Sequence, residues 1–191
     1  MAPAPPTLEP ELHYVIPTPH VPNSRLPIII YRGVLKGFEY DDIIELMQRN
    51  GWKKGGQWKT YKTAHYHTNV HEGYAVISGS VRYLLGKGPT DEDSNEGGKN
   101  YGVEVSFEKD DVFILPAGVS HNSIESEGDF EYIGFYVKDA PKWDMNYCKD
   151  DAEVTEQKKE RSWSVPIPET DPVYGAEGPL PRVWREVSST V

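Results

Sequence analysis

Three histidines and a glutamate lie within a run of eight residues in the first half of the chain, at His65, His67, His71 and Glu72. His65 and His67 are two residues apart, so in an extended strand both side chains point to the same face. The short segment of residues 68–70 could then let Glu72 return to that face from the next strand. Neutral imidazoles and a carboxylate together are typical ligands of divalent zinc, iron, nickel or manganese.

A second stretch supplies a further candidate ligand. The apolar residues 112–115 predict a strand, Pro-Ala-Gly follows at residues 116–118, and His121 comes three residues after the glycine. A turn of this composition limits the directions in which the following side chain can point. We therefore expect one divalent transition metal (Fe, Zn, Ni or Mn), held by side chains from two separate strand pairs. The four expected ligands are His65, His67, Glu72 and His121.

The two stretches resemble the two motifs of the cupin superfamily. The first motif reads G-x5-H-x-H-x(3,4)-E-x6-G, and its second half matches residues 65–79. The second reads G-x5-P-x-G-x2-H-x3-N and corresponds to residues 110–125, where the proline, second glycine and histidine match. Asp110 replaces the leading glycine of the second motif, and it would be strained if that position required a positive φ angle. The other departures are Lys59 and Glu125, which replace the leading glycine of the first motif and the closing asparagine of the second.

Longer segments resemble the small group of YjlB-like single-domain cupins. The matching segments are residues 26–33, 50–52, 65–72, 115–118 and 171–180. This resemblance implies an all-β fold, a single-domain cupin β-barrel (double-stranded β-helix or jelly roll, RmlC-like), with one short helix near the N-terminus. It implies a metal site but no particular reaction, because one fold hosts many chemistries.

The elements that must position these residues follow from periodicity and turn signals. Residues 40–50 predict the helix, since Asp41 or Asp42 can cap it and Gly51 follows it. Residues 52–57 predict a glycine-rich loop, residues 86–102 a long polar loop, and Gly79-Ser80 a turn. Strands are expected at residues 26–35, 58–67, 72–78, 81–85, 101–107, 112–115, 121–125 and 130–137.

The chain is expected to divide into three parts. Residues 1–25 are proline-rich and predict an extended arm, which could add an edge strand near His13. Residues 26–140 would form the barrel. Residues 141–191 would form an extension packed on the barrel or on a partner subunit, and the charged residues 149–161 within it could be helical.

The strand alternation also suggests which side chains line a cavity beside the metal. Either His71 or Glu72 could be the ligand, and the six residues between Glu72 and Gly79 favour Glu72. His71 would then face outwards or lie at the cavity mouth, where His71 or Tyr61 could act as an acid or base in catalysis. The expected substrate-binding residues are Thr63, Tyr74, Phe113 and Phe135, although one bulge would invert these assignments.

Composition excludes several classes of function. The chain has 191 residues and a formal net charge of −10, which disfavours binding to nucleic acids or to anionic membrane surfaces. No apolar run approaches the ~20 residues of a membrane-spanning helix, and no basic-then-apolar leader is visible. Cys148 is the only cysteine, so no internal disulfide can form. We expect a cytoplasmic protein that binds a small-molecule substrate and forms a homodimer through sheet edges or exchanged arms.

Two classes of function remain. The first is a mononuclear metal-dependent enzyme acting on a small oxygen-bearing organic molecule. Within it, a dioxygenase is preferred over a redox-neutral isomerase, lyase or decarboxylase, by resemblance to other metal-binding cupins. The alternative is a non-catalytic cupin module that binds or senses a small molecule. Dependence of a reaction on Tyr61 or His71 would separate the two.

Overall fold

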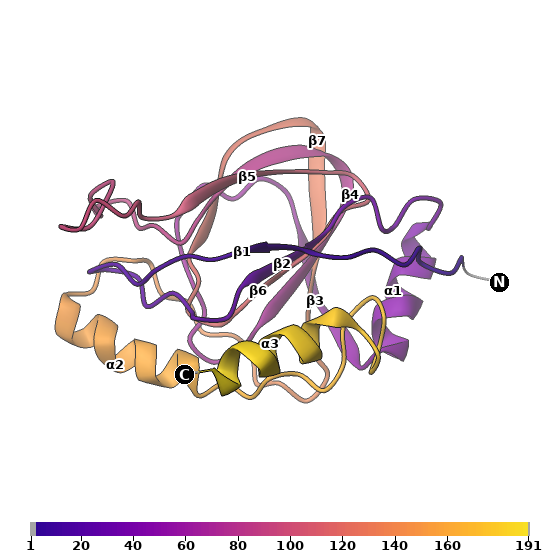
Figure 1. Ribbon diagram of the computed structural model, residues 1–191. Helices are drawn as coiled ribbons and strands as arrows, with labels where there is room; N and C mark the ends of the chain where they lie inside the picture. The colour runs from indigo at the N-terminus through magenta and orange to yellow at the C-terminus, as the bar shows by residue number, and fades with distance from the viewer. Residues whose placement is uncertain (1–2, 191) are drawn as a thin grey trace.

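The computed structural model describes residues 3–190 and contains one curled antiparallel sheet flanked by three helices (Figure 1). The strands follow the order β1-β2-β6-β4-β7-β3, and β5 pairs with the far part of β4. The path of hydrogen-bonded strands is open between β1 and β3, so the jelly roll is curled but not closed. The strands are β1 (Glu11–His13), β2 (Ile28–Tyr31), β3 (Trp52–Trp58), β4 (Glu72–Leu85), β5 (Val103–Glu108), β6 (Val112–Leu115) and β7 (His121–Val137). The expected all-β jelly-roll fold is confirmed.

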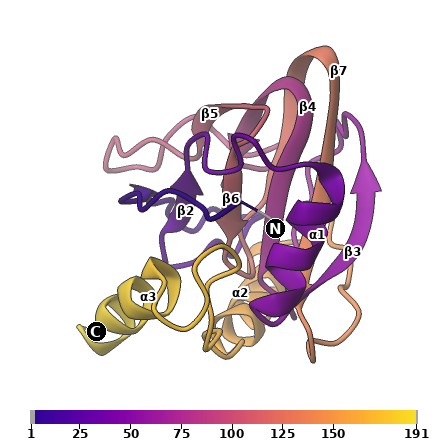
Figure 2. The ribbon, with the colours of Figure 1, turned by 90° about the vertical axis from the view of Figure 1, so that its right-hand side faces the viewer.

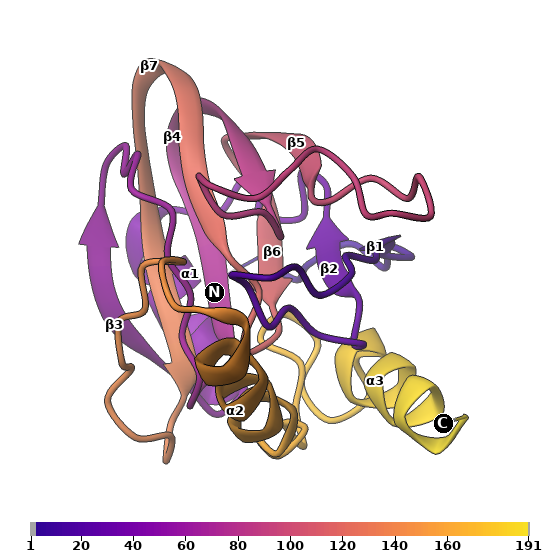
Figure 3. The same cartoon turned by 90° about the vertical axis from the view of Figure 1, so that its left-hand side faces the viewer.

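Two long strands, β4 and β7, form the spine of the sheet and run side by side over most of their length (Figures 2 and 3). Each was predicted as two short strands separated by a turn, and both of those turns are absent. Gly79 adopts a φ of +64° inside β4, where the pairing with β7 shifts register on both sides of Ser78. An added Cβ at Gly79 would overlap the Glu127 carbonyl oxygen. The glycine therefore produces a bulge that bends a continuous strand.

The loop predicted at residues 52–57 is a strand in the structure, and most of the strand predicted at residues 58–67 is irregular. Residues 52–58 form edge strand β3, paired with β7 from Trp52–Val137 to Trp58–Tyr132, whereas residues 59–64 are irregular. Gly55 and Gly56 indicated a loop, but they serve as points of close approach. An added Cβ at Gly55 would overlap the Tyr136 ring, and one at Gly56 would overlap the Trp58 ring. The glycines therefore let aromatic rings lie flat against the strand.

Helix α1 (Tyr40–Arg49) lies where it was predicted. Its N-cap is Glu39, whose backbone N–H donates to the Asp42 carboxylate at 3.0 Å. It ends at Asn50, before Gly51 with a φ of +82°. Its buried face contributes to the larger of the two main hydrophobic cores, which also contains Trp52 of β3. The helix thus covers one face of the β3–β7 edge.

Two further helices, α2 (Ala152–Trp163) and α3 (Pro179–Ser189), lie in the C-terminal extension; α2 overlaps the charged segment that could be helical, whereas α3 was not expected. Helix α3 begins with Pro179 and buries Leu180 and Trp184 in the same core as α1. The carboxylate of Asp171 accepts a hydrogen bond from the Tyr31 hydroxyl and three more from backbone N–H groups. These contacts hold the segment before α3 against β2.

Asp110 adopts a φ of +78°, so the position does require the left-handed backbone that a glycine accepts most readily. Its N–H donates to the Val76 carbonyl, and its carbonyl accepts from the N–H of Leu35, both at 3.0 Å. These bonds hold the turn before β6 in place. Across residues 3–190, no helix combines the length and the apolar character that crossing a membrane requires.

Candidate metal centre

The three histidines expected to bind metal come together at the end of the β4–β7 spine. His65 and His67 belong to the segment before β4, and His121 is the first residue of β7. His65 and His121 pair through their backbones, with N–H to carbonyl distances of 2.9 and 3.3 Å. One ligand nitrogen from each of the three rings lies within 4.8 Å of the other two, and all three residues are buried. This cluster could hold one metal ion.

Each imidazole in the cluster is held in one tautomer by the backbone. The Nδ1 atoms of His65, His67 and His121 each bond to a carbonyl oxygen. A carbonyl can only accept, so Nδ1 carries the proton and Nε2 is left with its lone pair. The accepting carbonyls are those of Thr63 (2.9 Å), Asp144 and Val119 (3.1 Å). The rings are therefore prepared to bind a cation through Nε2.

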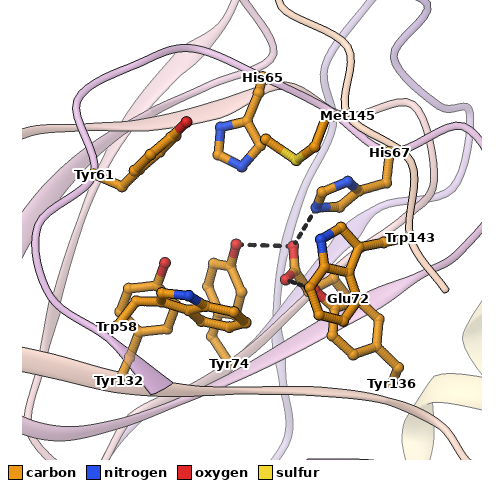
Figure 4. A pocket seen from close by; sticks show the side chains of 10 residues that line it. All are labelled: Trp58, Tyr61, His65, His67, Glu72, Tyr74, Tyr132, Tyr136, Trp143 and Met145. Carbon is orange, nitrogen blue, oxygen red and sulfur yellow. Dashed lines mark hydrogen bonds and ion pairs between the residues drawn. The ribbon is translucent and has the colours of Figure 1, made fainter. Parts of the chain in front are cut away.

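Glu72 lies beside the three histidines. Its Oε2 lies 3.3 Å from His67 Nε2 and 3.5 Å from His121 Nε2. The Tyr74 hydroxyl donates to the same oxygen at 2.8 Å, and the Tyr136 hydroxyl donates to Oε1. The two tyrosines thus fix the plane of the carboxylate, as Figure 4 shows from the pocket side.

The electrostatics of the cluster suit cation binding. Burial opposes ionisation of Glu72, but the neighbouring His67 and His121 and the Tyr136 hydroxyl outweigh it and lower the pKa of Glu72 to about 2. Burial also acts against a charge on His67, yet attraction to Glu72 raises the pKa of His67 above its ordinary value. Burial lowers the pKa of His65 and of His121, so these two rings stay neutral. Neutral imidazoles beside an ionised carboxylate are the form that binds metal, so a cation bound here would displace the proton that Glu72 favours on His67.

His71 points away from this cluster, contrary to the expectation that it faces outwards or lies at the cavity mouth. Its Nδ1 accepts from the Ala117 N–H at 3.0 Å, and its ring packs on Trp184 of α3 at 4.7 Å between centroids. The side chain is buried, and burial lowers the pKa of His71 to about 4, although the carbonyls of Val165 and Pro166 act in the opposite direction. His71 therefore lies between the sheet and the C-terminal extension.

A pocket of about 170 Å³ opens beside the cluster (Figure 4). We call it the aromatic pocket because six of its ten lining residues are tyrosine or tryptophan. The lining residues are Trp58, Tyr61, His65, His67, Glu72, Tyr74, Tyr132, Tyr136, Trp143 and Met145. Tyr61 and Met145 are each more than a third exposed and form its rim, whereas Glu72 lies at its floor.

Of the four residues expected to bind substrate, Tyr74 lines this pocket, and so does Tyr61, which was expected to act as an acid or base. Tyr61 stands edge-on to the His65 ring at 4.8 Å, and Tyr74 reaches Glu72. Thr63 is exposed, and only its backbone carbonyl contacts the cluster. Phe113 lies behind Tyr74 in the hydrophobic interior, edge-on at 4.8 Å. Phe135 packs on the opposite face of the sheet, in the core beneath α1.

The prediction placed Phe135 on the wrong face of β7. Gly73 pairs with Phe135 and Tyr74 pairs with Gly134 in a stretch without register shifts. Tyr132, Gly134 and Tyr136 therefore share the pocket side, and Phe135 lies on the other face, opposite to the one predicted. Sequence reasoning also missed five pocket residues: Trp58, Tyr132, Tyr136, Trp143 and Met145. Trp143 and Met145 lie beyond the last strand, in a segment with no periodicity that could have identified them.

The segment that carries Trp143 and Met145 is tied to the histidine loop by Asp144. Its carboxylate accepts from the N–H and hydroxyl of Thr68 at 2.7 and 2.5 Å, while its carbonyl holds His67 Nδ1. Asn69 forms a further bond to the Asp144 N–H at 3.0 Å. The C-terminal extension therefore provides two pocket walls and the partner that orients one histidine.

Comparisons with known proteins agree with the predicted resemblance. No family model matches the chain. The chain is similar to the uncharacterized protein YjlB of Bacillus subtilis (strain 168), with 26% identity over 167 residues, which cover 86% of this chain and 90% of YjlB. This match confirms the resemblance to YjlB that the short segments predicted.

Solved structures with partial similarity include a point mutant of the oxalate decarboxylase OxdC of Bacillus subtilis, with a TM-score of 0.36 and 16% identity. That match covers 63% of this chain and 27% of the decarboxylase, so the chain spans about a quarter of its length. The epimerase RmlC of Legionella pneumophila, in complex with dTDP-4-keto-L-rhamnose, matches with a TM-score of 0.33 and 15% identity over 67% of this chain and 71% of RmlC.

Proposed function

We propose that this chain, which has the jelly-roll fold of the cupins, is a mononuclear metal-dependent enzyme that acts on a small oxygen-bearing organic molecule. One observation carries the proposal: three imidazoles with backbone-fixed tautomers and one ionised carboxylate converge at the floor of the aromatic pocket. A cluster of this composition is costly to bury without a cation, because the carboxylate must otherwise share protons with the histidines.

The proposed ligands are His65, His67 and His121 through Nε2, together with Glu72 through Oε2. A divalent transition metal bound there would supply Lewis acidity that polarises a substrate oxygen. The donor set of nitrogens and one carboxylate fits Fe, Zn, Ni or Mn.

The chain's own residues have separate tasks in this proposal. Tyr74 and Tyr136 hold Glu72 in one orientation through their hydroxyls, and the aromatic walls exclude water from the reacting side. Tyr61 stands at the rim beside His65, so we assign the acid–base role to its hydroxyl. His71 does not share that role, because its ring contacts Trp184 and does not line the pocket.

A dioxygenase remains our preference over an isomerase, lyase or decarboxylase. The preference comes from the resemblance to metal-binding cupins, and the native metal decides it. Activity that iron restores and zinc does not would support the dioxygenase. Equal activity with zinc and iron would exclude it in favour of a redox-neutral reaction.

The first test is the metal content of the purified protein, measured by elemental analysis after reconstitution. We expect about one metal ion per wild-type chain. We expect little metal in His67→Ala or Glu72→Gln, because each variant loses one of the proposed ligands. His13→Ala is the matched control, since His13 lies on edge strand β1 far along the sheet from the cluster. A wild-type protein without metal would contradict the proposal, provided that circular dichroism shows it to be folded.

A non-catalytic binding or sensing module is the second candidate. It is supported by the scarcity of acid–base groups in the pocket. Among the described residues that line it, the only acid–base groups besides the proposed ligands are tyrosine hydroxyls. Tight ligand binding without turnover, unaffected by Tyr61→Phe, would favour this alternative.

We also propose that the protein is a cytoplasmic homodimer. Strand β1 pairs only with β2 among the described elements, so its other edge is available to a second copy. Light scattering of a chain lacking residues 1–25 would test the dimer. A dimer mass that survives the deletion would remove the N-terminal arm from this interface.

A further inference from the structure

The aromatic pocket carries a more specific inference about the substrate. We propose that the pocket binds an uncharged aromatic ring that bears hydroxyl groups on one edge, with that edge directed at the floor. The inference rests on the proposed function and deepens it by naming the class of substrate. It stands on three features of the pocket: its charge, its walls and its polarity from rim to floor.

The charge of the pocket disfavours anionic substrates. Among the described residues that line it, none is lysine or arginine, and the only carboxylate, Glu72, is hydrogen-bonded at the floor. The proposed metal ion would pair with a negative charge at the floor, but a further charge of a dicarboxylate or phosphate, directed at the aromatic walls, would have no cationic side chain beside it. Burial of a charge is strongly unfavourable unless that charge is paired. A ligand that carries no charge away from the floor avoids this cost.

The walls of the pocket suit a flat ring. Tyr136 and Trp143 stack in parallel, with centroids 4.8 Å apart and planes at 7°. Trp58 meets Trp143 edge-on at 6.0 Å and lies 5.9 Å from Tyr132. Rings in such arrangements offer faces and edges to a further ring, and an aromatic pair is stabilised beyond the area that it buries.

The size of the pocket limits the size of the ligand, and its polarity determines how the ligand is oriented. A cavity of about 150 Å³ holds one benzene molecule, so the pocket's 170 Å³ matches one ring with small substituents. Its hydrogen-bonding groups gather at the floor, where the hydroxyl of Tyr74 lies within 2.9 Å of both Glu72 and His121. The opposite end is framed by Met145 and Tyr61. A ring with its hydroxyl groups at one end would place them at the polar floor and would leave its apolar end towards Met145 and Tyr61.

Three probes separate the features of this ligand. Catechol has a neutral ring with two adjacent hydroxyls, cis-cyclohexane-1,2-diol has the hydroxyls without the aromatic ring, and oxalate has oxygens with charge and no ring. Each is titrated by calorimetry into protein without metal and into protein loaded with zinc, which does not oxidise catechol. Trp143→Ala removes one wall, and Trp163→Ala is the matched control because Trp163 lies at the end of α2, outside the pocket.

We expect saturable binding of catechol, at least tenfold tighter than that of the diol or oxalate. Trp143→Ala should weaken catechol binding about tenfold, since it removes one stacked ring and its buried area, and Trp163→Ala should leave it unchanged. Oxalate binding as tightly as catechol, or Trp143→Ala binding catechol like the wild type, would overturn the inference.

The two proposals fail in different ways. Saturable, Trp143-dependent catechol binding to a protein that never takes up metal would support the ring site and remove the metal enzyme. Metal uptake that depends on His67, without Trp143-dependent catechol binding, would do the reverse.

Discussion

The burial of His71 predicts a distinct dependence of stability on pH. In the folded protein its ring is enclosed by Ala117, Trp184 and the backbone near Val165, and the pKa of His71 falls from the usual 6.5 to about 4. In the unfolded chain the ring is solvated and keeps its usual pKa. Between these two values the unfolded state binds the proton and the folded state does not, so stability increases with pH across this window.

The size of the effect follows from the same two values. Each pH unit between them corresponds to about 1.4 kcal/mol, so His71 should cost about 3 kcal/mol of unfolding free energy at pH 4 relative to neutral pH. Above pH 6.5 His71 is unprotonated in both states and does not lower the free energy of unfolding. As the pH falls from 6.5 towards 4, the free energy of unfolding falls by this amount. A proton on His71 therefore opposes the folded state throughout the mildly acidic range.

Urea unfolding of the metal-free protein from pH 4 to 7.5 measures this contribution. His71→Asn is the comparison, because the Asn side-chain oxygen can accept from the Ala117 N–H but does not titrate. The cavity left by the smaller side chain costs the same at every pH and cancels. The difference in unfolding free energy between wild type and variant should therefore rise by about 3 kcal/mol across the range. A difference that stays constant with pH would refute the argument, because it would mean that the pKa of His71 is the same in the folded and unfolded states.

Three further predictions concern the extension, the histidine loop and the turn at Asp110. Trp184→Ala should lower the free energy of unfolding by about 3–5 kcal/mol in chemical denaturation, because the ring is fully buried and its N–H donates to Pro27, whereas Trp163→Ala should cost far less. Asp144→Ala should weaken zinc binding about 10–100-fold by calorimetry, because the loop that orients His67 loses its anchor; an unchanged affinity would mean that the backbone alone orients the ring. Asp110→Gly should raise the free energy of unfolding by up to about 1 kcal/mol and Asp110→Ala should lower it, since φ is +78°; the opposite order would contradict the proposed strain.

The local part of the site could be predicted from sequence because its geometry is set by short spacings. His65 and His67 are two residues apart, and His121 follows a Pro-Ala-Gly turn, so their convergence needed only strand parity and one turn. Helix α1 likewise follows from a local apolar stripe and a terminating glycine. Glu72 approached the cluster as expected, within 3.3 Å of His67.

Features that depend on contacts between distant segments could not be predicted. Gly55 and Gly56 indicate a loop when considered alone, and only the rings of Trp58 and Tyr136 above them explain why they lie in a strand. The face on which Phe135 lies depends on its pairing with Gly73 of β4, which no local pattern in β7 reveals. The burial of His71 is due to Trp184, more than a hundred residues away in sequence.

The contribution of the C-terminal extension to the pocket has a consequence for synthesis. A chain leaves the ribosome from its N-terminus, so His65 and His67 emerge first, then His121, and Trp143 and Trp184 last. Until Asp144 has emerged, His67 lacks the carbonyl that holds its tautomer. A nascent chain therefore exposes an incomplete, solvated set of imidazoles, and the proposed metal site with its pocket is complete only after residues 143–145 have emerged. Chains interrupted between the end of β7 and residue 143 would carry all four proposed ligands yet lack Trp143 and Met145 of the pocket.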